Sequence, residues 1–100
     1  MLHTLNKSPF ERAGLASCLR LAGKASVVLL YEDGVYAALR DTAATGKIEA
    51  ALKDLSFYVL GPDLAARGIE AERVIEGVEV VDYGGFVDLV VEHGPVQAWL

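Results

Sequence analysis

Short apolar runs separated by helix-like segments constrain the fold of this chain more than any other feature. Residues 26–31, Ser-Val-Val-Leu-Leu-Tyr, are apolar at almost every position. Such a continuous run is typical of a strand covered on both faces, because a strand with one face in water alternates apolar and polar residues. Phe57–Leu60 and Val78–Val81 have the same character, and Met1–Leu5 is expected to form a short first strand. Trp99–Leu100 is expected to form a last short strand or a packed tail.

Helix signals lie between these runs. Ser8 is expected to cap a first helix, with Pro9 at the first helical position and Glu11 reaching back to the cap. That helix is predicted to run to about Ala22 and to stop at Gly23. The other helices are predicted at Val35–Arg40, Gly46–Asp54, Asp63–Arg67 and Gly85–His93.

Strands that alternate with helices favour a mostly parallel sheet with helices on both faces. The sequence contains no internal repeat, low-complexity tract or linker that would mark a boundary. We therefore predict one small three-layer α/β domain of the doubly wound type, spanning residues 1–100.

Charge and composition limit the partners of this domain. Nine basic and fourteen acidic residues give a net charge of −5, which disfavours direct binding to nucleic acid. No apolar run approaches the ~20 residues of a membrane span, and no signal peptide is recognisable, so a cytoplasmic protein is expected. Without its four tyrosines and with its ten glycines, the apolar set makes up 59% of the chain, against a usual ~45–50%. This surplus indicates contacts with other subunits.

Four acidic residues follow the predicted strands and should share the carboxyl edge of the sheet, where ligands of such folds bind: Glu32, Asp33, Asp63 and Asp82. No dinucleotide or nucleoside-triphosphate motif accompanies them, and their charge would repel phosphate. We interpret them mainly as helix caps. A paired-carboxylate acid/base site is the alternative, and a small-ligand site near Asp33 and Asp82 is a further hypothesis.

The two histidines and the single cysteine have no metal-ligand spacing, so neither a metal site nor a cofactor site is predicted. His93 is interpreted as a charge partner of a helix C-terminus. His3 either belongs to the core or faces the ligand edge of the sheet.

Cys18 is the one candidate catalytic residue. On the first predicted helix it shares an apolar arc with Phe10, Leu15, Leu19 and Leu21, which favours packing in the core. It is not at a helix N-terminus, and Arg20 points elsewhere, so nothing nearby is expected to lower its pKa.

A series of short segments extends over nearly the whole chain. The segments are His3–Phe10 with Cys18 downstream, Glu32–Ala38, Tyr58–Leu64 with Ala66–Gly68, Val80–Tyr83, Gly85–Leu89 and Val96–Leu100. In this order they resemble the TusB/DsrH family, and together they are specific although each is short. The resemblance implies a DsrE-like fold of Rossmann/flavodoxin-like topology.

The resemblance also implies a function. A member of this family would be the small subunit of a cytoplasmic sulfur-relay complex, together with DsrE/TusD-like and DsrF/TusC-like subunits in a dimer of heterotrimers. The complex would pass persulfide sulfur to a DsrC/TusE-like carrier protein. The principal persulfide cysteine would lie in the DsrE/TusD-type partner, which makes this chain an accessory subunit.

Two branches of the relay and two roles of Cys18 remain open at this point. Glu11–Arg12 and Ser17–Leu19 resemble the form found in sulfur oxidisers, so we expect dissimilatory sulfur oxidation, with tRNA wobble-uridine 2-thiolation as the alternative. Cys18 either carries persulfide in transit or is structural, in which case the chain shapes and stabilises its catalytic partner.

Overall fold

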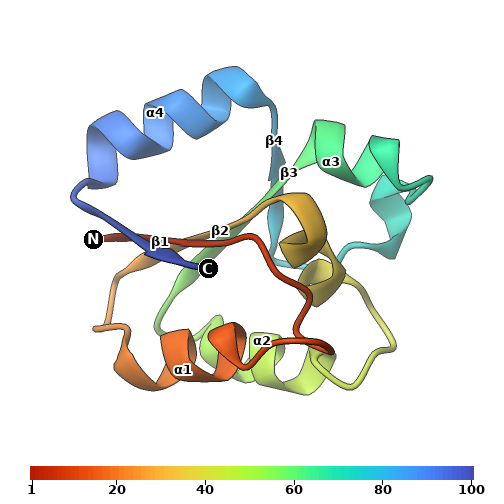
Figure 1. The fold of residues 1–100 in the computed structure, drawn as a ribbon, viewed down its shortest axis with the longest axis horizontal. Coiled ribbons are helices and arrows are strands. Elements are labelled where there is room, and N and C mark those ends of the chain that lie inside the picture. The colour runs from red at the N-terminus through yellow and green to blue at the C-terminus, as the bar shows by residue number, and fades with distance from the viewer.

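Five parallel strands form a single sheet in the order β4-β3-β2-β1-β5 (Figure 1). The structure is a computed structural model that describes all residues from 1 to 100. The strands are β1 (Leu2–Leu5), β2 (Val27–Leu30), β3 (Ser56–Leu60), β4 (Glu79–Val81) and β5 (Val96–Trp99). Every residue of β1 and β2 is buried, because these central strands have neighbours on both edges and helices on both faces. The predicted α/β class with a parallel sheet is confirmed.

The two edge strands differ from the prediction. The run at Val78–Val81 was expected to be covered on both faces, but β4 has a neighbour on one side only, and Glu79 and Val80 are exposed. At the other edge the chain ends in a strand that begins at Val96, before the predicted position. This strand pairs with β1, so that the two ends of the chain lie side by side, with Leu5 opposite Trp99.

The helices form two unequal layers. The helical elements are α1 (Gly14–Leu21), the 3-10 helix η1 (Glu32–Ala38), α2 (Thr45–Ala51), α3 (Gly61–Ala66), the 3-10 helix η2 (Ala71–Arg73) and α4 (Tyr83–His93). In Figure 1, α1 and α2 lie side by side below the sheet and α4 crosses above it. None of these helices has the length and apolar character needed to cross a membrane.

The first helix begins later than predicted. The Ser8 carbonyl accepts hydrogen bonds from the N–H groups of Glu11 and Arg12, both at 3.1 Å, but the segment closes as a turn and α1 starts only at Gly14. The Ser8 hydroxyl accepts from the N–H of Phe10 at 3.2 Å, so it caps this turn and not a helix. The physical reason is packing: residues 10–13 are exposed, so burial in the core contributes little to stabilise a helix there.

The second predicted helix, Val35–Arg40, is a 3-10 helix that starts three residues earlier, at Glu32. Gly34 is required where this helix meets the sheet. A Cβ atom at this position would lie 2.1 Å from the carbonyl oxygen of Leu5, so the backbone of η1 lies directly against the end of β1. Only glycine allows this approach.

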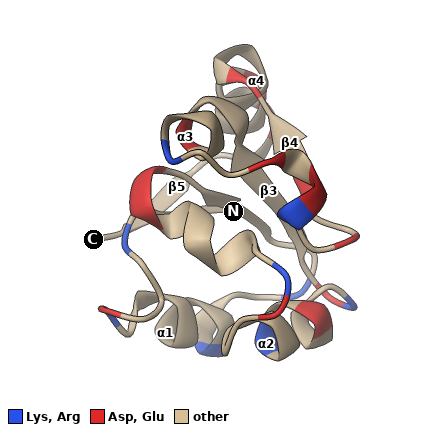
Figure 2. Cartoon of the chain, turned by 90° about the vertical axis from the view of Figure 1, so that its right-hand side faces the viewer, with Lys and Arg blue, Asp and Glu red and all other residues tan.

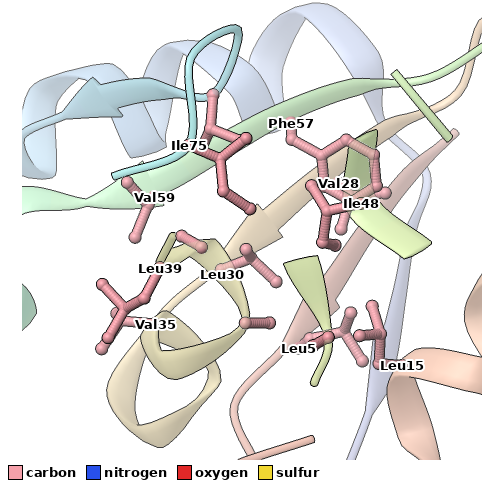
Figure 3. Close-up of a cluster of buried hydrophobic side chains, with 14 of the residues drawn as sticks. Leu5, Leu15, Val28, Leu30, Val35, Leu39, Ile48, Phe57, Val59 and Ile75 are labelled. Carbon is pink, nitrogen blue, oxygen red and sulfur yellow. The ribbon is translucent and has the colours of Figure 1, made fainter. Parts of the chain in front are cut away.

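The buried core is also divided unequally between the two faces of the sheet. A cluster of 18 buried residues fills the space between the sheet and α1, η1 and α2 (Figure 3). On the α4 side, only Leu2, Val27, Leu29 and Leu89 form a buried cluster. The α4 layer is therefore thin, which leaves apolar side chains of α4 in solvent.

Candidate functional site

Cys18 lies in the interior of the main core and has no exposed surface. It belongs to the face of α1 that packs on the sheet, together with Leu15. Burial raises the pKa of the Cys18 thiol to about 11. At pH 7, about one such thiol in ten thousand is ionised, and the thiolate is the form that reacts with sulfur donors. The predicted burial of Cys18 is thus confirmed. The predicted apolar arc is confirmed only in part, because Phe10 and Leu21 are 55% and 65% exposed and Phe10 precedes the helix.

Of the four carboxylates predicted mainly as helix caps, only Asp82 caps the helix that it precedes, while Asp33 and Asp63 bind groups more than 30 residues away. Asp82 caps α4, because its Oδ1 accepts a hydrogen bond from the N–H of Gly85 at 2.8 Å, as predicted. The carboxylate of Asp63 accepts from the N–H of Glu32. Asp33 pairs with Arg67, whose Nη2 and Nε lie 2.9 and 3.1 Å from Oδ1.

The Asp33–Arg67 pair ties the start of η1 to the end of α3, and the carboxylate raises the pKa of the Arg67 guanidinium. Sequence analysis missed this role of Arg67, because the two residues are 34 positions apart and nothing local links them. None of the four surface hollows is lined by Asp33 or Asp82. The small-ligand hypothesis therefore has no cavity to support it. No group of three or more His, Cys, Asp or Glu side chains is arranged to hold a metal ion.

His3 is a core residue and joins the two ends of the chain. Its Nδ1 accepts a hydrogen bond from Nε1 of Trp99 at 3.1 Å, and the two rings stack with centroids 6.2 Å apart. Because Nδ1 is an acceptor, the ring is neutral and carries its proton on Nε2. Burial and, less strongly, the nearby N-terminal charge lower the pKa of His3. His93, by contrast, lies in the last turn of α4, as predicted.

The pKa of His3 predicts a loss of stability in acid. The folded protein resists protonation of His3, whereas the unfolded chain takes up the proton near pH ~6.5. The free energy of unfolding therefore falls as the pH drops below ~6.5, until the lower folded pKa is passed. We expect His3→Gln to reduce this loss in urea titrations at pH 5 and pH 7.5, and His93→Gln to retain it. Equal pH dependence in the wild type and in His3→Gln would contradict the assignment.

One flank of α4 is an exposed apolar stripe. Tyr83, Val87 and Val91 lie one turn apart on the same side of the helix and are 61%, 60% and 78% exposed. Phe86 and Leu89, on the adjoining side, pack on the sheet. The apolar surface of α4 is thus wider than the sheet can cover, and a stripe of this kind is typical of a subunit interface. The signal was present in the sequence, because the helix Tyr83–His93 is apolar on more than one face.

The fold first defines a class of small α/β proteins. The structure resembles the ychN protein from E. coli, with a TM-score of 0.81 and 19% identity over 97% of each chain. It also resembles MTH1491 from Methanobacterium thermoautotrophicum, with a TM-score of 0.77 and 23% identity over 97% of this chain and 95% of the other. At these identities, the likeness concerns the fold alone.

The sequence then defines the family. The family model for DsrH like protein matches residues 7–96. Relatives named Protein TusB are 40% identical in Pectobacterium parmentieri, 44% in Erwinia tasmaniensis and 36% in Escherichia coli O1:K1 / APEC, each over 99% of this chain and 100% of the relative. The chain belongs to the DsrH/TusB family.

Proposed function

We propose that this chain is the TusB-type subunit of a sulfur-relay complex, in which it supplies protein–protein surface and not the sulfur-carrying cysteine. The observation that carries the second half of this proposal is the complete burial of Cys18. Membership of the DsrH/TusB family supports the first half.

The chemistry of the relay explains why burial matters. An acceptor thiolate attacks the outer sulfur of a donor persulfide, the S–S bond breaks, and the donor cysteine leaves as a thiolate, so no external oxidant or reductant is needed. Each step requires an ionised sulfur that a second protein can reach. With a thiol pKa of about 11 and no exposed surface, Cys18 meets neither requirement. The persulfide would therefore form on a DsrE/TusD-like partner, as the resemblance implies.

The relatives change the preferred branch of the relay. Residue resemblance at Glu11–Arg12 and Ser17–Leu19 led us to expect dissimilatory sulfur oxidation, but the relatives from Pectobacterium, Erwinia and Escherichia are named TusB. They favour the alternative, tRNA wobble-uridine 2-thiolation. The earlier expectation depended largely on Cys18, and a cysteine that packs in the core carries little information about sulfur chemistry.

The apolar stripe of α4 supports the need for partners. Tyr83, Val87 and Val91 are exposed on a chain whose net charge of −5 disfavours direct contact with RNA. We infer that a DsrE/TusD-like or DsrF/TusC-like subunit covers this stripe, within a dimer of heterotrimers that delivers sulfur to a DsrC/TusE-like carrier.

Co-expression tests the proposal. The chain, tagged and expressed with the two related subunits from the same genome, is expected to co-purify with both in equal amounts by native mass spectrometry. The assembled complex should then transfer labelled sulfur to the carrier protein. A stable monomer that binds neither of the two related subunits would overturn the proposal.

The role of Cys18 gives a separate prediction. In the assembled complex, Cys18→Ala is expected to leave sulfur transfer to the carrier within about twofold of the wild type, at a stability cost of about 1 kcal/mol for one deleted core atom. After loading with a sulfur donor, intact mass should show no adduct of about 32 Da, one sulfur atom, on this chain.

The opposite results would assign persulfide transport to Cys18. They are an adduct that disappears in Cys18→Ala, or loss of transfer while the complex remains assembled. A partner cysteine that acquires the adduct in the same sample serves as the internal control for loading.

A further inference from the structure

A shallow, largely apolar surface depression runs along α1 and α2 and is widely open to solvent at its centre. The two helices lie side by side below the sheet (Figure 1). The depression consists of three adjoining hollows of about 270, 490 and 270 Å³. The first and second share Ala16 and Lys47, and the second and third share Leu19 and Ala51. We call this feature the α1–α2 groove. It is on the face of the molecule opposite to α4.

The floor of the α1–α2 groove is apolar. Its central hollow is lined by Leu19 and three alanines, and the hollow near the start of α1 adds Pro9 and Phe10. Phe10 has more than half of its surface in solvent because the turn before α1 holds it outside the core. A surface of this kind gains free energy when another apolar surface covers it.

The rim of the groove has the opposite charge to the rest of the protein. Four of the nine basic residues line it, namely Arg12, Arg20, Lys24 and Lys47, against Asp54 as the one acidic residue. The groove therefore carries a charge of +3, while the remaining residues carry −8. None of the four cations forms an ion pair within the chain, because the one ion pair that involves a lysine or an arginine joins Arg67 to Asp33. In Figure 2, Lys and Arg are visible on both helices of this layer.

We propose that the α1–α2 groove is the docking site for an acidic amphipathic helix of a neighbouring subunit. Arg20 lies on α1, Lys47 lies on α2 and Arg12 lies in the turn before α1, so cations flank the apolar floor from both helices. A helix with an apolar stripe bordered by Asp and Glu matches this arrangement in shape and in charge. The inference rests on the proposed function, which supplies the neighbouring subunits.

This chain itself shows what such a helix looks like. In α4 the exposed Tyr83, Val87 and Val91 are accompanied by Asp88 and Glu92 on the next face. The chain's own α4 cannot fill the groove, because it lies on the other side of the sheet (Figure 1). RNA fits less well than a helix: four cations and an apolar floor with a single aromatic ring provide neither a phosphate track nor a stacking surface.

Charge reversal in the assembled complex tests the proposal. The double variant Arg20→Glu, Lys47→Glu should weaken binding to the two related subunits at least tenfold, and the remaining binding should depend less on salt. The control is Lys53→Glu, Arg73→Glu, which changes the net charge equally at exposed positions that line no hollow. We expect its Kd to stay within twofold of the wild type. Circular dichroism and thermal melting verify that both variants fold.

A second measurement uses the unmodified protein. A carbodiimide joins lysines to carboxylates that touch them, so cross-linking of the wild-type complex should connect Lys47 or Lys24 to Asp or Glu on a helix of a partner. The proposal would be overturned if the groove variant bound the two subunits as tightly as the wild type, or if these cross-links were absent. Groove-dependent self-association of the chain alone, or groove-dependent binding of tRNA, would also overturn it. Failure of any complex to form would overturn the proposed function as well, whereas a complex indifferent to the groove would remove this inference alone.

Discussion

Replacing Gly34 by alanine is expected to destabilise the protein by about 3 kcal/mol or more, at the upper end of the range for inserting atoms into a packed interior. The new Cβ would lie 2.1 Å from the carbonyl oxygen of Leu5 and 2.8 Å from its carbonyl carbon. Neither neighbour can move aside easily. Leu5 pairs with Leu30 and Trp99 across the sheet, and its carbonyl accepts a hydrogen bond from the N–H of Tyr31 at 3.1 Å.

Urea unfolding measures this effect, and Gly46→Ala is the matched control. Nothing lies within 4 Å of a Cβ at Gly46, which is an exposed position inside α2. Alanine there should stabilise the protein by about 0.5–1 kcal/mol, because glycine has the poorer helix propensity. Equal unfolding midpoints for the two variants would show that η1 does not lie against the end of β1.

The second large effect is expected from Phe57→Ala, which should cost about 3–5 kcal/mol. Phe57 is 2% exposed and projects from β3 into the main core, where Figure 3 shows it near Val28 and Ile48. Removing its ring would leave a cavity under α2 and loosen the layer that forms the α1–α2 groove. For a domain of this size, such a loss approaches the whole free energy of unfolding.

Phe10→Ala makes the same chemical change at an exposed position and serves as the control. Because Phe10 has more than half of its surface in water, its removal should change the free energy of unfolding by less than about 1 kcal/mol. Denaturant titrations of the two variants give the comparison directly. Similar losses of unfolding free energy in both variants would contradict the assignment of Phe57 to the core and of Phe10 to an exposed turn.

The sequence alone was sufficient to predict features that depend on residues close together in the chain. The continuous apolar run at residues 26–31 predicted β2 as a strand buried on both faces, and Asp82 with Gly85 predicted the cap of α4. Cys18 was predicted to pack in the core, and its burial beside Leu15 agrees, although Phe10 and Leu21 of the same predicted arc are exposed. Strand burial, caps and helical periodicity are encoded within a few residues, so they can be read locally.

Other features were decided by the tertiary structure. The capping signal at Ser8–Glu11 was outweighed because residues 10–13 stay exposed and gain little from packing, so α1 begins at Gly14. The contact of His3 with Trp99 joins residues 96 positions apart, and the one between Asp33 and Arg67 joins residues 34 apart. The α1–α2 groove likewise exists only because β1, β2 and β3 bring two helices side by side. Local sequence sets the preference of each segment for helix, strand or turn. Which preference is realised depends on the surfaces that the sheet brings together, and so does every site built from residues that are distant in the sequence.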